Sequence, residues 1–212
     1  MTDISVSSFM ELVAGRAGHF GMESGLHSAL WLDLDTLFAS PTRIEPFIAE
    51  LADMLRAFRV DAVCGPLLGG AFLAQRVAQT LDTEFWFTEP AAPADGSGLY
   101  RARYRLPRSF TTRLTRPRLA LVDDVMSAGS SLRATYAELR SHTDVVAVGS
   151  LLQLGPVGAD YFAEQRIPVR AVVKHDFETW PPSECPHCAA GARLESVAAP
   201  AAQRTGSTAR DA

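Results

Sequence analysis

Two adjacent carboxylates followed by a loop of small residues are the stretch with the clearest capacity for chemistry. Asp123 and Asp124 come directly after the apolar run 119–122, and the loop 127–131, Ser-Ala-Gly-Ser-Ser, follows them. Small residues let backbone N–H groups approach a phosphate, and the serine hydroxyls add further donors. Carboxylates repel a phosphate, so they are expected to face hydroxyls or a cation of the same ligand. The stretch therefore predicts a site for a sugar phosphate with Mg²⁺; the alternative is an ordinary strand–turn–helix with Asp124 as a cap.

A buried strand and a helix must position these groups. A short apolar run that ends in turn residues predicts the strand, and Leu132, Tyr136 and Leu139 recur at helical spacing after the loop. A second small-residue loop, 65–70, lies between another apolar run and another helical pattern. In parallel sheets, anionic ligands bind at the carboxyl ends of strands, where helices begin. If the two strands are neighbours, both loops line one crevice.

The order of patterns along the chain predicts an α/β fold. Apolar runs at 59–64, 84–87, 119–122, 145–152 and 169–174 alternate with helical patterns, one of which begins at Pro41. We expect an open, mainly parallel sheet with flanking helices. A short helix is expected over 5–15, and the glycine-rich segment 18–28 should form a hairpin-like or irregular hood over the crevice. Residues 1–192 are expected to be a single domain, and 193–212 a disordered tail rich in alanine, proline and serine.

Composition excludes several classes of protein. The chain has 212 residues, of which 47% are hydrophobic, and no apolar run approaches the length of a membrane span. No signal peptide is recognisable, and three cysteines are too few for a disulfide framework, so we expect a cytoplasmic protein. The formal net charge of −4 argues against general nucleic-acid binding.

Positive charge is concentrated in the segment 100–118, called the arginine segment below, which contains seven arginines and no acidic residue. It lies within a stretch, 89–117, that shows no secondary-structure period. Arg101, Arg103 and Arg105 alternate, which places them on one side of an extended chain. Because guanidinium groups grip phosphates bidentately, we expect a mobile lid that closes on a polyphosphate. The alternatives are a solvated basic hairpin and an RNA-binding strip.

Near the C-terminus, Cys185-Pro186-His187-Cys188 suggests half a zinc site, with His175 or His187 nearby. A second pair of ligands is not apparent in the sequence, so a proline-containing turn is the alternative. A redox role for the two cysteines is a further, weaker alternative.

The stretch 122–130 resembles the motif of the type I phosphoribosyltransferases, which bind phosphoribosyl pyrophosphate (PRPP). The closest resemblance is to orotate phosphoribosyltransferases, over roughly residues 10–192. Besides that motif, it rests on Gly18–Phe20 with Ser24–Ser28, similar to the family's base-binding segment, and on Gly65–Gly70, similar to its pyrophosphate loop. Trp180–Gly191 is similar to a C-terminal signature of one branch.

The resemblance implies transfer of ribose 5-phosphate from PRPP to a heterocyclic base, orotate first, with release of pyrophosphate. It also implies Mg²⁺, held by Asp123 and Asp124 indirectly through PRPP, and a homodimer whose lids act across subunits. The implied catalytic residues are Asp123, Asp124, Arg101, Arg103 and Arg105. The implied PRPP-binding residues are Gly65, Pro66, Leu68, Gly69, Gly70, Val125, Met126, Ser127, Ala128, Gly129, Ser130 and Ser131. The implied base-binding residues are Glu23, Ser24, Gly25, His27, Trp31 and Leu32, with His19 as a further possible contact.

The chain departs from the family pattern at three points. Its single lysine, Lys174, lies outside the arginine segment, where the family has a lysine. The segment 152–155 carries no charge where many members have Asp-Arg, and Glu23 stands where some have a lysine. Two alternatives therefore remain open: a phosphoribosyltransferase for a different base, and a non-catalytic regulator of the same fold that senses PRPP or a nucleotide.

Overall fold

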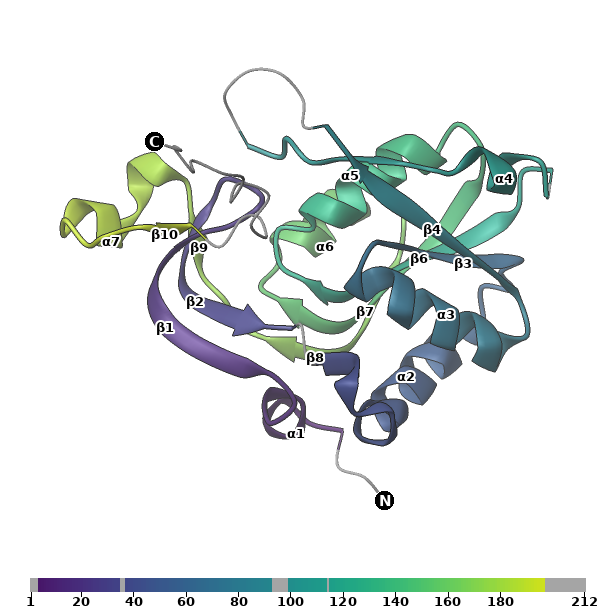
Figure 1. The fold of residues 1–212 in the computed structure, drawn as a ribbon, viewed down its shortest axis with the longest axis horizontal. Helices are drawn as coiled ribbons and strands as arrows, with labels where there is room; N and C mark the ends of the chain where they lie inside the picture. Colours follow the sequence, from purple (N-terminus) through teal and green to yellow (C-terminus); the bar gives the residue numbers. More distant parts are fainter. Residues whose placement is uncertain (1–3, 35–36, 93–98, 114, 197–212) are drawn as a thin grey trace, which may run out of the picture.

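The computed structural model describes residues 4–34, 37–92, 99–113 and 115–196, which form two β-sheets with flanking helices (Figure 1). The larger sheet has six strands in the order β5-β4-β3-β6-β7-β8, and the smaller has four in the order β10-β1-β2-β9. The larger sheet comprises β3 (Ala62–Pro66), β4 (Glu84–Ala91), β5 (Arg103–Arg105), β6 (Arg118–Met126), β7 (Asp144–Leu154) and β8 (Val169–His175). The smaller comprises β1 (Ala14–Gly21), β2 (His27–Asp33), β9 (Thr179–Trp180) and β10 (Glu195–Ser196). The helices are α1 (Val6–Met10), α2 (Pro41–Arg56), α3 (Gly69–Leu81), α4 (Arg108–Thr111), α5 (Ser130–Leu139), α6 (Val157–Glu164) and α7 (Pro186–Ala189), with short 3₁₀ turns at Leu37–Ala39 and Pro182–Glu184.

The larger sheet is parallel from β4 through β3, β6 and β7 to β8, and only β5 runs antiparallel, on the edge beside β4. The predicted open, mainly parallel sheet is therefore confirmed. β6 lies within it with both faces covered, as its continuous apolar run requires. Ala120 and Val122 belong to the core cluster that contains residues of α2 and α3, whereas Leu119 and Leu121 belong to the cluster that contains residues of α5 and α6.

Helix α2 follows directly from its sequence pattern. It begins at Pro41, a favourable first helical residue, and buries Ile44, Phe47, Ile48, Leu51 and Leu55 along one face. Leu51 packs closely on β7, because a Cβ added at Gly149 would lie 3.1 Å from its Cδ1. The helix at Pro41 was predicted and is confirmed.

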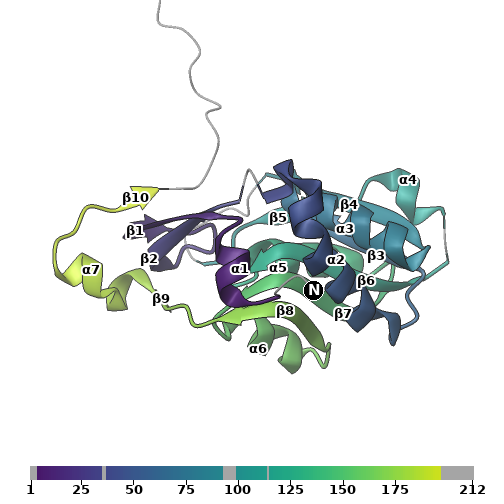
Figure 2. The same ribbon diagram turned by 90° about the horizontal axis from the view of Figure 1, so that it is seen from below.

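The predicted hood is a hairpin joined by the C-terminal segment. β1 and β2 pair antiparallel, and a turn closes them, in which Gly25 has a positive φ of 83°. β9 pairs with β2, and β10 pairs with β1 through Phe20 and Glu195. Figures 1 and 2 place this smaller sheet, called the hood below, at the opposite end of the molecule from α4. The expected tail boundary at residue 193 was too early, since 195–196 form a strand; residues 197–212 lie outside the described part.

Two other expectations differ from the structure. The N-terminal helix, expected over 5–15, spans only Val6–Met10, because the chain enters β1 at Ala14 and pairs with β2. Part of the stretch 89–117 is regular: β5 pairs with the end of β4, and the Phe110 ring stacks on that of Trp86 at 5.5 Å. Residues 93–98 and 114 of that stretch lie outside the described part. Within the described residues, no helix is both long enough and apolar enough to cross a membrane.

Replacing Leu51 with alanine should destabilise the fold. Leu51 is fully buried between α2 and the sheet, so its truncation should lower the free energy of unfolding by about 2–5 kcal/mol. The measurement is urea-induced unfolding followed by circular dichroism. Asp53→Ala is the matched control on the same helix, because that side chain is exposed and its ion pair with Arg56 should contribute less than about 1 kcal/mol. Equal unfolding free energies for the two variants would contradict the packing described here.

Candidate functional site

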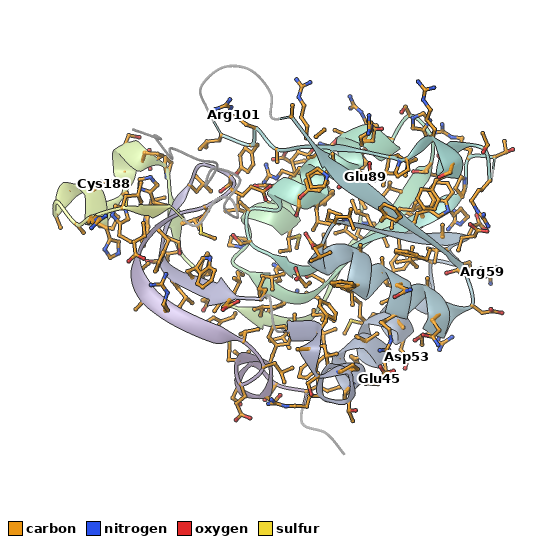
Figure 3. All side chains as sticks on the ribbon, viewed as in Figure 1. Glu45, Asp53, Arg59, Glu89, Arg101 and Cys188 are labelled. Atoms are coloured by element: carbon orange, nitrogen blue, oxygen red, sulfur yellow. The ribbon has the colours of Figure 1, made fainter. Side chains whose placement is uncertain are left out.

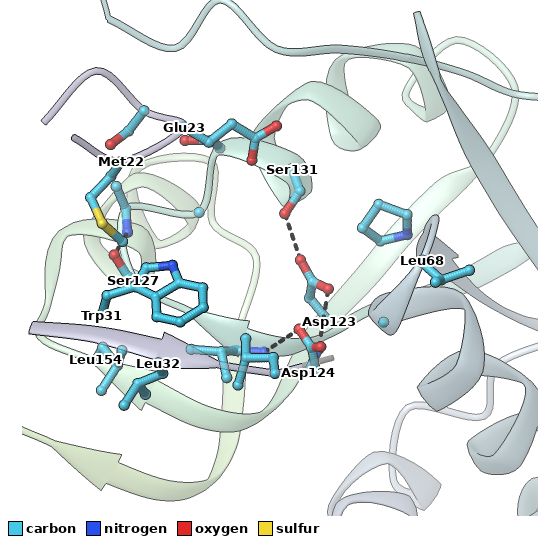
Figure 4. A pocket seen from close by; sticks show the side chains of 18 of the residues that line it. Met22, Glu23, Trp31, Leu32, Leu68, Asp123, Asp124, Ser127, Ser131 and Leu154 are labelled. Atoms are coloured by element: carbon cyan, nitrogen blue, oxygen red, sulfur yellow. Dashed lines mark hydrogen bonds between the residues drawn. The ribbon is translucent and has the colours of Figure 1, made fainter. Parts of the chain in front are cut away.

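Two loops meet at the carboxyl ends of neighbouring parallel strands. β3 and β6 pair directly, with Ala62 opposite Leu119, so the loops that follow them converge on one side of the sheet. A cavity of about 320 Å³ lies there, between these loops and the hood (Figure 4). Its lining comprises Met22, Glu23, Ser24, Leu30, Trp31, Leu32, Leu34, Pro66, Leu67, Leu68, Gly69, Tyr104, Asp123, Asp124, Val125, Ser127, Ala128, Gly129, Ser130, Ser131, Leu154 and Phe177. The single crevice expected from the two loops is therefore present.

Asp123 and Asp124 form the floor of this cavity. They are only 6% and 9% exposed. The Ser131 hydroxyl donates a hydrogen bond to Oδ2 of Asp123 at 2.5 Å (Figure 4). The backbone N–H of Asp124 donates to Oδ1 of Asp123 at 3.1 Å, and that of Val125 donates to Oδ1 of Asp124 at 2.7 Å. Backbone and hydroxyl donors thus orient both carboxylates.

Burial raises the pKa of both carboxyl groups above the ordinary aspartate value. For Asp123 the charge of Asp124 raises the pKa further, and the hydrogen bond from Ser131 offsets part of that rise. The described lining contains neither lysine, arginine nor histidine, and its carboxylic acids are Glu23, Asp123 and Asp124. A cation or a set of ligand hydroxyls would relieve this electrostatic cost.

Glycines allow the loop after β3 to pack against the two carboxylates. A Cβ added at Gly69 would lie 2.0 Å from Oδ2 of Asp124, and one at Gly70 would lie 2.6 Å from Oδ1 of Asp123. At Gly65 a Cβ would lie 1.9 Å from the carbonyl oxygen of Gly70. Gly69 and Gly70 therefore set how closely this loop approaches the carboxylates, and Gly65 lets the loop fold tightly on itself. Of the predicted residues in this loop, Pro66, Leu68 and Gly69 line the cavity, whereas Gly65 and Gly70 support it from behind.

The second loop presents the start of a helix to the cavity. Gly129 adopts a left-handed conformation, with φ of 71°, and α5 begins at the next residue. All five residues of 127–131 line the cavity, with Val125 beside them, whereas Met126 is fully buried beneath. A helix N-terminus with exposed N–H groups and serine hydroxyls is suited to bind an anion such as a phosphate.

The hood supplies the opposite wall. Among the predicted base-binding residues, Glu23, Ser24, Trp31 and Leu32 line the cavity. Gly25 and His27 are not among the lining residues. His27 is directed elsewhere: its Nδ1 lies 3.3 Å from Sγ of Cys188. The expectation that His27 contacts the base is therefore not supported by its position.

Several lining residues were missed in the sequence, chiefly Tyr104, Leu154 and Phe177. Tyr104 alternates with the arginines of β5, so the pattern that put Arg103 and Arg105 on one side already put Tyr104 on the other. Burial and nearby carboxylates raise the pKa of the Tyr104 phenol, which therefore keeps its proton and can donate a hydrogen bond into the cavity. Phe177 follows β8 and had no distinguishing pattern.

The three arginines lie outside the cavity. Arg101, Arg103 and Arg105 are exposed, and Arg105 lies 3.6 Å from Glu89. Arg103 lines a neighbouring cavity of about 500 Å³ that shares Tyr104 and Ser130 with the first. In this arrangement none of the three contacts the space above Asp123.

A comparison with family models found no match. An orotate phosphoribosyltransferase from Carboxydothermus hydrogenoformans is 33% identical over 186 residues, which cover 86% of this chain and 90% of that protein. The chain belongs to the orotate phosphoribosyltransferase family. It is accordingly an enzyme, a PRPP-dependent phosphoribosyltransferase, and the family suggested by the motif at 122–130 is confirmed.

Solved structures show the same fold. The orotate phosphoribosyltransferase of Aeropyrum pernix aligns with a TM-score of 0.59 at 22% identity, over 76% of this chain and 88% of that one. An adenine phosphoribosyltransferase from Thermoanaerobacter pseudethanolicus aligns with a TM-score of 0.62 at 14% identity, over 81% and 100%. The type I phosphoribosyltransferase fold is thus established for this chain. Because an adenine phosphoribosyltransferase has the same fold, the fold alone does not identify the base.

Asp123→Asn should stabilise the protein in the absence of ligand and Mg²⁺. The folded-state pKa of Asp123 lies well above its ordinary value of 3.8, so the folded chain holds a proton that the unfolded chain releases as the pH rises. Wild-type stability should therefore fall with rising pH relative to the variant. We expect the variant to be more stable by about 1–2 kcal/mol at neutral pH, with the difference shrinking toward pH 4.

Thermal unfolding across that pH range measures the effect. Asp144→Asn is the control, because that carboxylate is about half-exposed and should show no such pH-dependent gain. A neutral-pH destabilisation by Asp123→Asn would show that the carboxylate is held favourably.

Proposed function

We propose that this phosphoribosyltransferase uses orotate as its acceptor, requires Mg²⁺ and works as a homodimer in pyrimidine nucleotide biosynthesis. The observation that carries the proposal is the cavity floor, where two oriented carboxylates lie beside a serine-rich helix start, in a chain whose relative is an orotate enzyme. Neither observation supports the whole proposal by itself. The cavity floor fits any enzyme that uses PRPP, and the choice of orotate rests on the similarity to an orotate phosphoribosyltransferase.

The positions of the lining residues suggest how PRPP would lie. Its 5′-phosphate would occupy the loop 127–131, its ribose hydroxyls would face Asp123 and Asp124, and its pyrophosphate would lie against 66–69. A ring nitrogen of the base, held under the hood, would then displace pyrophosphate at the anomeric carbon. The two carboxylates would stabilise the positive charge that develops on the sugar as the bond to pyrophosphate lengthens. This reaction needs positioning and charge complementarity rather than a covalent enzyme nucleophile.

Magnesium fits the donors present. Carboxylate and phosphate oxygens are its preferred ligands, and it usually retains waters and binds together with substrate phosphates. Asp123 and Asp124 would hold it indirectly, through the ribose hydroxyls and pyrophosphate of PRPP. When bound, the ion would neutralise charge on the departing pyrophosphate.

The exposed arginines are proposed to supply the remaining positive charge. The acidic cavity would have to receive a polyphosphate, yet Arg101, Arg103 and Arg105 are exposed and do not line it. In a homodimer with lids acting across subunits, as the family resemblance implies, these side chains would reach the partner's pyrophosphate. Their guanidinium groups would then stabilise the leaving group in a site from which water is excluded.

The base is proposed to lie between apolar walls and Glu23. Trp31, Leu32 and Leu154 line that end of the cavity and would cover the faces of a planar ring. A charged Glu23 would oppose the carboxylate of orotate, but burial raises the pKa of Glu23 and makes its neutral form easier to reach. The neutral carboxyl could donate a hydrogen bond to the base instead.

Pyrophosphate release from PRPP with a panel of bases tests the proposal. We expect orotate to give a kcat/KM of about 10⁴ M⁻¹s⁻¹ or more, with uracil and adenine at least roughly 100-fold lower and EDTA abolishing turnover. Asp123→Asn combined with Asp124→Asn should lower turnover by more than about 100-fold, whereas Asp144→Asn should not. If orotate is inert while another base reacts, the acceptor is wrong and the transferase assignment stands.

Replacing Arg101, Arg103 and Arg105 together by alanine should lower kcat by about 100-fold while changing PRPP affinity less than tenfold, because the lost interaction acts mainly on the leaving group. Steady-state kinetics and calorimetric PRPP binding separate the two effects. The matched control removes the same charge from exposed arginines elsewhere, Arg43, Arg56 and Arg140, and should leave kcat unchanged.

Mixed dimers test whether the arginines act across subunits. One subunit carries the double aspartate substitution with intact arginines, and the other carries the triple arginine substitution with intact aspartates. Mixing and re-association should restore activity, since one complete site forms. Continued inactivity of the mixed dimer would place the arginines in their own subunit's site.

A further inference from the structure

Four metal-binding side chains meet at the outer end of the hood, outside the cavity. His19 comes from β1, His27 from β2, Cys185 from the turn before α7, and Cys188 from α7 itself. Their donor atoms all lie within 4.8 Å of one another. Figure 3 shows Cys188 at this end of the molecule, far from Asp53 and Arg59. We propose that these residues form a structural Zn²⁺ site that fastens the C-terminal segment to the hood hairpin.

The spacing of the donor atoms matches tetrahedral zinc. Nε2 of His19 lies 3.0 Å from Nδ1 of His27, 3.4 Å from Sγ of Cys185 and 3.6 Å from Sγ of Cys188. Zn–N and Zn–S bonds of about 2.0 and 2.3 Å, arranged tetrahedrally, separate the nitrogens by about 3.3 Å and a nitrogen from a sulfur by about 3.5 Å. A zinc ion therefore fits between the four atoms with shifts of a few tenths of an ångström.

Hydrogen bonds among the four side chains account for their short separations less well than a bound zinc ion does. Nδ1 of His19 lies 3.0 Å from the carbonyl oxygen of Ala192, which can only accept, so Nδ1 carries the ring proton and Nε2 presents a lone pair. Three neighbours crowd that one lone pair. A shared metal accounts for this convergence, and the bond to a backbone carbonyl is the usual way in which a metal-binding histidine is oriented.

The composition of the cluster selects the metal. Two thiolates and two imidazoles suit Zn²⁺ and are poor ligands for Mg²⁺, which prefers oxygen. Four protein donors fill a tetrahedral site, which is typical of structural rather than catalytic zinc. His187, which the sequence offered as a ligand, instead stacks on the His19 ring at 5.4 Å. The missing second pair of ligands is His19 and His27, which lie over 150 residues earlier in the chain.

The segment that carries the cysteines has almost no core of its own. Among residues 181–195, Cys185 is the single buried one. On either side, the chain is tied to the hood by strands of only two residues, β9 and β10. Small structures with so little buried apolar surface usually need a cross-link or a metal to hold one conformation. The burial pattern therefore points to a bound metal independently of the donor geometry.

The proposed site also bears on the cavity. His19 and His27 lie on the two strands joined by the turn 22–26, and Met22, Glu23 and Ser24 of that turn line the cavity. None of the four ligands lines it. Zinc would thus act on the base-binding wall through the hairpin, by holding the strands that carry the turn, and would take no part in the chemistry.

Metal analysis of the full-length protein, purified without chelators, tests the proposal. Mass spectrometry of the metals should find about one Zn²⁺ per chain, and X-ray absorption should find two sulfur and two nitrogen ligands. Replacement by Co²⁺ should give the visible absorption of a tetrahedral site with thiolate charge transfer. Cys185→Ser with Cys188→Ser should lower the zinc content to below about a tenth per chain and make the C-terminal segment sensitive to protease.

Two further variants keep the test decisive if that double variant folds poorly. Cys188→His preserves four ligands at an exposed position, and should keep the zinc while removing about half of the thiolate charge-transfer intensity in the cobalt protein. His187→Asn alters the neighbouring histidine and should leave the zinc content unchanged. Wild-type protein that binds no zinc, a double cysteine variant that retains it, or a Cys185–Cys188 disulfide under reducing conditions would each overturn the proposal. Because metal content is the readout, these outcomes do not depend on which base the enzyme uses.

Discussion

The burial of two adjacent carboxylates at the end of a central parallel strand is the constraint on which the active site depends. β6 is apolar on both faces up to Val122, so the sheet holds Asp123 and Asp124 in place where the strand leaves the core. Keeping them there has an electrostatic cost, seen in the raised pKa of both groups. Backbone N–H groups, the Ser131 hydroxyl and the close approach of Gly69 and Gly70 orient the pair and offset part of that cost. Ligand hydroxyls and a cation would relieve the remainder, and under the proposed function this would make the site complementary to a ribose that is becoming positively charged.

Negative and positive charges are separated around the cavity. The charged residues that line the cavity are acids, whereas Arg103 and Arg105 lie exposed on the edge strand β5 and Arg101 lies exposed just before it. Arginines inside the cavity would form ion pairs with Asp123 and Asp124 and would compete with the sugar for them. Under the proposed function, separating the two charges would leave the carboxylates for the ribose and the guanidinium groups for a phosphate that arrives with the substrate. Tyr104, on the inner side of the same strand, places a neutral donor where a cation would be captured.

The outer end of the hood is not stabilised in the same way as the main sheet. The main sheet has two apolar cores, and its strands are held by burial. The hood's outer end has little apolar surface to bury, and its two shortest strands come from the far end of the chain. The proposed zinc site would supply there the stability that burial supplies elsewhere, and it lies on the strands joined by the turn that carries Glu23 and Ser24. Zinc occupancy and the geometry of the proposed base-binding wall would thereby be linked.

Local sequence patterns were enough to predict much of the fold and the geometry of the proposed sugar-phosphate half of the site. The apolar run, the carboxylate pair and the small-residue loop lie within 13 consecutive residues, 119–131, so their relative positions follow from strand and helix geometry. The same holds for α2, whose buried face repeats at helical spacing, and for the loop 65–70, whose glycines permit close backbone approach. Parallel pairing of β3 with β6 was expected only conditionally, because strand order is a long-range property.

What the tertiary structure decided depends on contacts between residues far apart in the chain. The partners of Cys185 and Cys188 are His19 and His27, and no local period connects positions separated by more than 150 residues. The pairing of β10 with β1 likewise gave structure to residues whose composition indicates disorder. Tyr104 and the arginines share an alternating pattern that defines two sides, but only the packing of β5 beside β4 determines which side faces the cavity. Local pattern thus specified the residues of the carboxylate floor. The cluster of His19, His27, Cys185 and Cys188 was specified by the folding of both chain ends onto one hairpin, because side chains from distant segments become neighbours only when those segments pack together.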